Sequence, residues 1–506
     1  MSIRFANPLA WRALLRPAAG LAICLALAGC ITTPLQERDW VRVETQHFDV
    51  WSSLGADESL RLAIELERFR TATGFVAGRE LPADPLPTRV LAFDDRGIGR
   101  PFAYLSQRGY LLARQPGDVI VLRTGGGWEG DAWTALKLDY ARRLIWNSSR
   151  DTAPPWLDEG LPQVASTIEA RDDGAHAGVA RSDHVATLRD SVWIPFDRLL
   201  GATDLADWSA LERSVFAAES WALCHYFSFR EGQRLVPEGA VARYRDQLRQ
   251  GVTPAAAARS EFGDLGELQH EVWTVARAGS FAAGALRIPW SGPRPQVRPV
   301  GRPEVAEQLG ELALAIGETE LAADFLEQVE PPVSGTARAL AAAGALAEAR
   351  GESGDADAHF SAALAAAPDD VVVTLRHADL LRTRAQHADD AQRNALAQRA
   401  RSDYARAIGL SDALAESHAG FASIHWIDGQ ESGASLEHAR IAHRLLPGDG
   451  EISLLAARLE LAVGDRAAAR ELAARAATRA HSDGDLDAAR AVLAQIDGYD
   501  ERAAIR

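Results

Sequence analysis

Charged side chains on two neighbouring predicted helices are the first candidates for chemistry in this chain. Asp139 and Arg142 lie in Trp133–Trp146, where apolar residues recur at helical spacing, and Glu159 lies in the next helical segment. Two carboxylates could serve a hydrolase as general acid and general base. The sequence supplies no complete set of nucleophile, base and oxyanion donor, so these residues alone do not define an active site.

The predicted helix over Trp133–Trp146 has two different faces. We expect its apolar stripe to pack on the core, and this stripe consists of Trp133, Leu136, Tyr140, Ala141, Leu144 and Ile145. Leu138, Asp139 and Arg142 lie off the stripe, so we expect them on the side of a cleft.

Two segments carry a family resemblance. Residues 152–161, Thr-Ala-Pro-Pro-Trp-Leu-Asp-Glu-Gly-Leu, resemble the P-x-W-L-x-E-G-L segment of gluzincin-type metallopeptidases, closest to the peptidase MA-like domains of bacterial lipoproteins and repeat proteins. Ser220–Phe227 is similar to another helix of these domains. The resemblance covers about residues 40–278. It implies an α+β domain, a small sheet followed by helices, with Glu159 at the position of the third zinc ligand.

The same resemblance implies a His-Glu-x-x-His helix, in which two histidines hold zinc and the glutamate activates the bound water. This chain has Leu138-Asp139-x-x-Arg142 there. A leucine offers no lone pair, and a guanidinium group repels Zn²⁺. We therefore expect no metal, no cofactor and no catalytic residue, and we interpret Leu138, Asp139, Arg142 and Glu159 as the remnant of a lost zinc site.

An ion pair is the expected replacement for the metal. Arg142 stands where the cation stood and Glu159 where its carboxylate ligand stood, with Asp139 nearby, so pairing would satisfy these charges. The alternative is that both side chains point separately into water.

Other polar residues suggest structural roles. His176, Asp183 and His184 could form a metal or catalytic cluster, but the polar, glycine-containing stretch Arg171–Arg189 favours a solvated loop. His225 is expected to be a hydrogen-bonded helix histidine, and Cys224, which has no partner, a small buried side chain.

The N-terminus has the layout of a secretory signal, with a basic stretch before a short apolar run. Its end, Leu27-Ala28-Gly29-Cys30, resembles the lipobox of bacterial lipoproteins, which implies cleavage before Cys30 and a lipid anchor on its sulfur. Ile31 after the cysteine, by resemblance to enteric sorting rules, favours the outer membrane, with the protein facing the periplasm. The alternative is an ordinary signal peptide with a chance cysteine.

The C-terminal part is alanine-rich and helical, with internal repetition. Gly344, Ala356, Phe360, Ala363 and Pro368 stand at the spacings of a tetratricopeptide repeat, which implies an all-α solenoid. Tyr404 and Pro447 mark further units, with about ten extra residues near 386–395. The alternative is an unrelated alanine-rich helical bundle.

Length and charge limit the possible organisation. The 506 residues exceed what one hydrophobic core supports, and the net charge of −16 disfavours nucleic-acid partners. We divide the chain into a signal peptide (1–29), a tether (30–39), a degenerate peptidase MA-like domain (40–278), a Pro-rich linker or surface strap (279–303) and tetratricopeptide-like repeats (304–500).

These features predict a membrane-anchored, non-catalytic envelope protein that binds protein or peptide partners through the groove of its C-terminal repeats. One alternative is a divergent envelope hydrolase with an unrecognised active site. Another is a purely structural envelope component.

Overall fold

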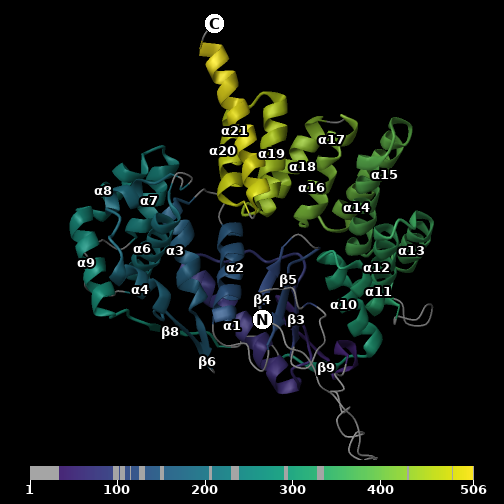
Figure 1. The fold of residues 1–506 in the computed structure, drawn as a ribbon, viewed down its shortest axis with the longest axis horizontal. Helices are drawn as coiled ribbons and strands as arrows, with labels where there is room; N and C mark the ends of the chain where they lie inside the picture. The colour runs from purple at the N-terminus through teal and green to yellow at the C-terminus, as the bar shows by residue number, and fades with distance from the viewer. Residues whose placement is uncertain are drawn as a thin grey trace, which may run out of the picture.

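A computed structural model describes residues 34–504 with gaps at 95–101, 103–108, 114–115, 125–130, 149–152, 172, 204, 206–207, 230–238, 290–293, 328–335, 430–431 and 481. Cys30 and the predicted signal peptide lie outside the described residues. In Figure 1 a sheet and a helical lobe occupy one side of the molecule, and a chain of helix pairs arches over them.

The main sheet has six strands in the order β4-β5-β3-β2-β1-β9. Strands β2, β3 and β5 are parallel neighbours, and the other pairings are antiparallel. Their bounds are Val41–Glu44 (β1), Phe48–Ser52 (β2), Thr88–Phe93 (β3), Gly109–Leu112 (β4), Val119–Arg123 (β5) and Val297–Pro299 (β9).

Both faces of this sheet are covered, which explains why its parallel strands are apolar almost throughout. Val50, Val90 and Ile120 point to one face, where they pack against α1 (Ala56–Ala77) and α2 (Asp131–Asn147). Alternate residues, Leu91 and Val121 among them, point to the other face and pack against the first repeat helices. The sheet is therefore shared between the two parts of the chain.

A helical lobe follows α2 and encloses a core around Trp156 and Trp221, both fully buried. Its helix α3 approaches α6 so closely that a Cβ at Gly160 would lie 2.4 Å from the carbonyl oxygen of Ser220. The lobe contains α3 (Pro155–Ser166), α4 (Ser182–Asp190), α5 (Phe196–Gly201), α6 (Ala210–Phe229), α7 (Ala240–Arg249), α8 (Pro254–Phe262) and α9 (Leu265–Ala278), with a second sheet of β6 (Glu169–Arg171), β7 (Gly174–Ala177) and β8 (Gly284–Arg287).

The Pro-rich stretch 279–303 is a strap and not a free linker. Its strand β8 pairs with β7 of the second sheet, and its strand β9 pairs with β1 of the main sheet. The expected tether is also shorter than 30–39, because the short helix η1 (Leu35–Glu37) buries Leu35 in the core that the sheet shares with the repeats. The strap is thus held by strand pairing, and Leu35 by apolar packing, in each case with residues far away in sequence.

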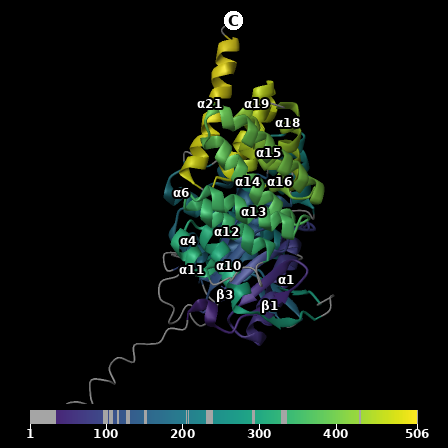
Figure 2. The ribbon, with the colours of Figure 1, turned by 90° about the vertical axis from the view of Figure 1, so that its right-hand side faces the viewer.

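The C-terminal half consists of stacked antiparallel helix pairs, as the repeat pattern predicts (Figure 2). The pairs are α10 (Arg302–Ala315) with α11 (Thr319–Leu326), α12 (Ala337–Ala349) with α13 (Ser353–Ala366), α14 (Val371–His387) with α15 (Asp390–Leu410), α16 (Ala415–Ser423) and α17 (His425–Asp428) with α18 (Ser432–Leu445), and α19 (Gly450–Val463) with α20 (Arg466–Thr478). Helix α21 (Asp483–Ala504) packs on α19 and α20 and ends the solenoid.

Gly344 and Phe360, two of the residues singled out for repeat packing, meet inside one helix pair. Phe360 is buried, and a Cβ at Gly344 would lie 2.6 Å from its ring, so only glycine permits this approach of α12 and α13. Tyr404 is also fully buried and fills the space beside Gly420 of the next pair. The extra residues near 386–395 lengthen α14 and α15 and leave only residues 388–389 between them.

Candidate binding site between the sheet domain and the repeats

The remnant-site residues lie where α2 faces α3. Arg142 Nη2 donates to both carboxylate oxygens of Glu159, at 3.1 and 3.3 Å, and Asp139 lies 3.7 Å from Arg142 Nη1. The predicted Arg142–Glu159 ion pair is therefore confirmed, and the expectation of two separately solvated side chains is wrong. Leu138 is half-buried beside them.

A hydrogen-bond chain continues this ion pair into the helical lobe. The side-chain amide of Gln163 donates to Glu159 at 2.6 Å, and its oxygen, Oε1, accepts from His184 Nε2 at 2.5 Å. Burial lowers the pKa of His184 to about 4, so its ring is neutral at pH 7. Because Glu159 already accepts from Arg142 and Gln163, it is poorly placed to act as a base.

The expectation of a solvated loop over Arg171–Arg189 is wrong. These residues form β7 and α4, and His184 is buried against Trp221. Polar neighbours in the sequence hid the burial of Leu188, which packs into the core of the helical lobe and holds α4 in place. His184 is thus a positioning residue for Gln163.

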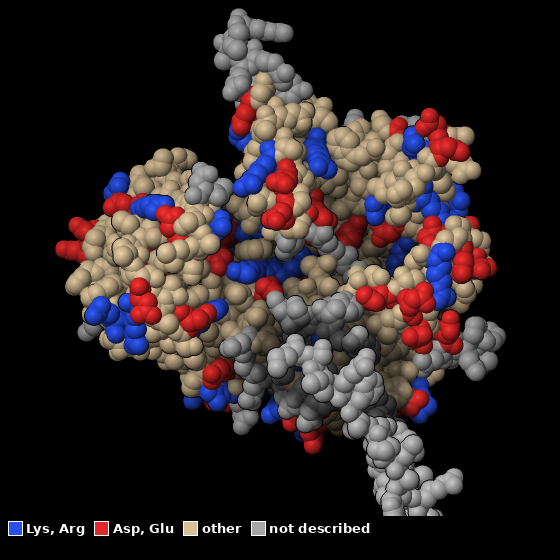
Figure 3. All heavy atoms as spheres, in the orientation of Figure 1, with Lys and Arg blue, Asp and Glu red and all other residues tan. Residues whose placement is uncertain are grey.

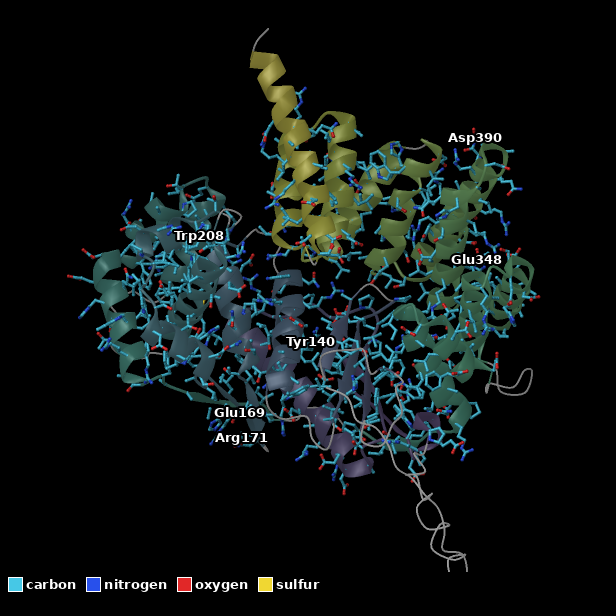
Figure 4. All side chains as sticks on the ribbon, viewed as in Figure 1. Tyr140, Glu169, Arg171, Trp208, Glu348 and Asp390 are labelled. Atoms are coloured by element: carbon cyan, nitrogen blue, oxygen red, sulfur yellow. The ribbon has the colours of Figure 1, made fainter. Side chains whose placement is uncertain are left out.

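The rest of α2 follows its predicted pattern, with one omission. All six residues of its apolar stripe are buried, and Tyr140 lies deep in the molecule (Figure 4). The omission is Lys137, whose ammonium group donates to the carbonyl oxygen of Ile168 at 2.7 Å. Burial lowers the pKa of Lys137 to about 8.

The two candidate structural residues of α6 behave as expected. His225 Nε2 is 2.8 Å from the carbonyl oxygen of Gly178, and Cys224 is a free, buried thiol. Among the residues that the structure describes, no group of three or more His, Cys, Asp or Glu side chains is placed to hold a metal ion.

We call the main sheet, α1, α2 and the helical lobe together the sheet domain. The repeats contact this domain a second time at their C-terminal end. The backbone amide of Gly448, between α18 and α19, donates to Asn147 at the end of α2, at 3.0 Å. Arg479, after α20, lies over the Trp146 ring at 4.0 Å and contacts Asp158 of α3 at 2.6 Å. The solenoid is therefore fixed to the sheet domain at both ends, and its inner side faces that domain (Figure 1).

A cavity of about 540 Å³ lies near this second attachment; we name it the α16 cavity. Its walls are the loop 80–88, Asp118, the end of α2, the beginning of α16 and the end of α18. Its charged lining residues are Glu80, Asp84, Asp118, Arg143, Glu416 and Arg444. In Figure 3 the surface is hollowed where the C-terminal repeats approach the sheet domain.

A second cavity, of about 510 Å³, lies near the first attachment; we name it the α10 cavity. It is bounded by β1, β2 and β3 on one side and by α10, α12 and α14 on the other. Its charges are paired: Arg42 with Asp49 at 2.6 Å, Arg376 with Glu311 at 2.7 Å, and Arg338 with Asp370 at 2.9 Å.

Comparison with known proteins gives only distant likenesses. No family model and no curated protein matches the chain. The chain is similar to TTC0263, a thermophilic TPR protein of Thermus thermophilus (19% identity, 38% of this chain, 98% of that one, TM-score 0.33). It is also similar to PilF of Pseudomonas aeruginosa (18%, 40% and 97%, TM-score 0.32) and to YrrB, described as a TPR protein with an unusual peptide-binding site (17%, 37% and 90%, TM-score 0.28).

Likenesses at these TM-scores do not assign a function. The assignment of tetratricopeptide-like repeats rests on the stacked helix pairs and on the packing of Gly344 and Phe360. Within the described residues, no helix has the length and apolar character needed to cross a bilayer.

Proposed function

We propose that this chain is a non-catalytic binding protein that holds an extended segment of a protein partner between its repeats and its sheet domain. One observation carries the proposal: the inner side of the solenoid does not pack solidly on the sheet domain but leaves two cavities, of about 540 and 510 Å³. Cavities of this size accept ligands, and helical repeats commonly receive peptides on their concave side.

Side chains of α2 and α3 support the proposed loss of the zinc site. A guanidinium group, that of Arg142, occupies the position of a histidine ligand in the resemblance, and it pairs with Glu159 at the position of the third ligand. A cation already neutralises this carboxylate, and Leu138 contributes no donor atom. We propose that the peptidase-like domain now serves as one wall of the binding space.

The zinc assignment can be tested by metal content. Residues 31–506, which include all of the described structure, should carry no zinc when purified without chelator and measured by elemental mass spectrometry. The variant Leu138→His/Asp139→Glu/Arg142→His should gain about one zinc per chain. Stoichiometric zinc in the native protein, with cleavage of a casein substrate, would favour the alternative hydrolase.

A fluorescent reporter tests partner binding in the cavity. Ala413 is exposed and lines the α16 cavity, whereas Ala405 on α15 is exposed but lines neither cavity. Cys224 is buried, so Ala413→Cys and Ala405→Cys can each be labelled selectively in residues 31–506. Peptides selected by display on the native protein should change the emission at position 413 but not at 405. No selectable peptide, or a response only at position 405, would contradict the proposed function.

We also propose that lipid on Cys30 anchors the protein to the bacterial envelope, in the outer membrane. The support is the sequence Leu27-Ala28-Gly29-Cys30 after a short apolar run. Replacing Cys30 with Ser should move the protein from the membrane fraction to the soluble fraction of the envelope. Retention in the membrane would show that another feature holds it there.

A further inference from the structure

The α16 cavity has more carboxylates than positive groups. Glu80, Asp84, Asp118 and Glu416 line it, against the guanidinium groups of Arg143 and Arg444. Arg143 already has an ion-pair partner, because its Nε donates to both carboxylate oxygens of Asp118, at 2.9 and 3.1 Å.

Among the described residues, Glu416 has no counter-charge in direct contact. It lies in the first turn of α16 and lines the cavity. The backbone amide of Glu416 donates to its own carboxylate, and the nearby charges include Arg143, Asp118 and Asp449. Burial raises the pKa of Glu416 to about 7. An ionised carboxylate here is therefore costly until a cation reaches it.

Asp84, in the loop 80–88, is incompletely compensated. The guanidinium group of Arg70 lies 3.3 Å from it, yet burial and the charge of Asp118 still raise the pKa of Asp84. Asp84, about a third of whose side chain is exposed, and Glu416 thus line one cavity with raised pKa values, which favours the binding of a positive ligand there.

The α10 cavity provides the contrast. Burial likewise raises the pKa of Glu307 to about 7, but Glu307 accepts a hydrogen bond from the hydroxyl group of Thr336 at 2.7 Å. Glu311 beside it contacts both Arg89 and Arg376. Among the described residues, each of these two carboxylates therefore has a hydrogen-bond or ion-pair partner in the α10 cavity.

We propose that the α16 cavity receives a basic side chain, lysine or arginine, of the partner segment, and that Glu416 and Asp84 contact its positive group. This inference rests on the proposed function. Leucine side chains supply apolar wall for the methylene stem of such a residue: Leu81, Leu86, Leu414, Leu445 and Leu446. An organic cation fits better than a metal ion, because the described carboxylates do not converge in groups of three or more on one point.

The proposed binding is coupled to the loss of a proton from Glu416. At pH 6 Glu416 is mostly protonated and must lose its proton before it can pair with the ligand, whereas at pH 8 it is mostly ionised. Binding should therefore be tighter at pH 8 than at pH 6, by up to about tenfold for one such group. Asp118, Asp449, Arg143, Glu80 and Arg444 also face this region.

Calorimetric titration of residues 31–506 tests this directly. The probe is Ac-Ser-Ala-Lys-Ala-Ser-NH₂, at millimolar concentration, with matched peptides that carry norleucine or glutamate in place of lysine. We expect 1:1 binding of the lysine peptide, stronger at pH 8. Glu416→Gln should weaken binding about tenfold and remove the pH dependence, and Asp84→Asn should also weaken it. Glu352→Gln is the control, since Glu352 is exposed and lines neither cavity, and it should have no effect.

Three results would overturn the inference. These are equal binding of the norleucine peptide, unchanged binding in Glu416→Gln, and stoichiometric binding of CaCl₂ alone that Glu416→Gln abolishes, which would define a metal site. If selected peptides alter emission at position 413 but do not depend on lysine or arginine, the proposed function stands and this inference fails. If no selected peptide alters it, the proposed function itself fails.

Discussion

Two attachments of the repeats to the sheet domain differ in kind. At the first, α10 and α11 pack Leu309 and Phe325 against Leu91 and Val121 of the sheet, in one continuous apolar core. At the second, a few polar contacts join α2 and α3 to the last helix pair, chiefly that of Arg479 with Asp158. The first attachment makes the two parts one folding unit, whereas the second can weaken without unfolding the protein.

The sheet itself explains this difference. Parallel strands require cover on both faces, so removing α10 would expose a whole apolar face of β2, β3 and β5. At the second attachment, the neighbouring apolar residues Leu144 and Leu157 are already buried within the sheet domain, and Trp146 lies under the guanidinium group of Arg479. Opening of this attachment would expose the Trp146 ring and polar groups, and would widen access to the α16 cavity.

The largest expected effect comes from the first attachment. Leu309 is fully buried, so Leu309→Ala should lower the free energy of unfolding by about 2–5 kcal/mol. Because both parts share this core, urea unfolding should show the sheet domain and the repeats losing stability together. Leu211→Ala, at an exposed position, is the control and should change stability by less than about 0.5 kcal/mol. Two separate unfolding transitions, of which Leu309→Ala shifts only one, would show that the sheet domain and the repeats do not share one core.

A smaller and more local effect is expected at the second attachment. Arg479→Ala leaves Asp158 without its partner in a buried place and should cost about 1–3 kcal/mol. Hydrogen exchange should quicken in α19 and α20, while β3 and β5 stay protected. Asp158→Asn with Arg479→Met should cost less than the two single changes added together. Equal loss of protection in the sheet would show that the second attachment belongs to the same core as the first.

The Arg142–Glu159 pair should contribute less, because about a quarter of each side chain remains exposed. Arg142→Ala should lower the free energy of unfolding by about 1 kcal/mol, visible as a fall in Tm. The exposed pair of Arg259 and Asp197 provides a control, and Arg259→Ala should leave Tm nearly unchanged. An unchanged Tm in Arg142→Ala would remove the structural role that we assign to this pair.

The smallest effect concerns pH and compares the two cavities. A carboxyl group whose pKa is raised on folding stabilises the protein at low pH, and this stability is lost as pH rises from about 4.5 to about 7. Glu416→Gln and Glu307→Gln should each therefore reduce the fall in stability between pH 5 and 8, by about 1 kcal/mol. Urea denaturation of each variant at several pH values would measure this. If a variant loses stability with rising pH as steeply as the native protein does, the carboxyl group that it lacks is already ionised across this range.

Much of the local structure could be predicted from the sequence. Helical spacing identified the buried stripe of α2, and the spacing of a tetratricopeptide repeat identified the helix pairs of the C-terminal half. The short strands β4, β6, β8 and β9 were missed, because most of their residues are only half-buried and show no clear alternation. Leu188 and His184 were also misjudged, since polar neighbours hid their burial.

By itself, the sequence determined the buried stripe of α2, because periodicity is a local property of the chain. It also determined the lack of zinc ligands at Leu138 and Arg142, and the placement of Gly344 beside Phe360. Only the tertiary structure decided what covers the second face of the sheet, where the last repeat attaches, and that Asp84 and Glu416 line one cavity. These contacts join residues up to about three hundred positions apart, such as Asn147 and Gly448, and no local pattern specifies them.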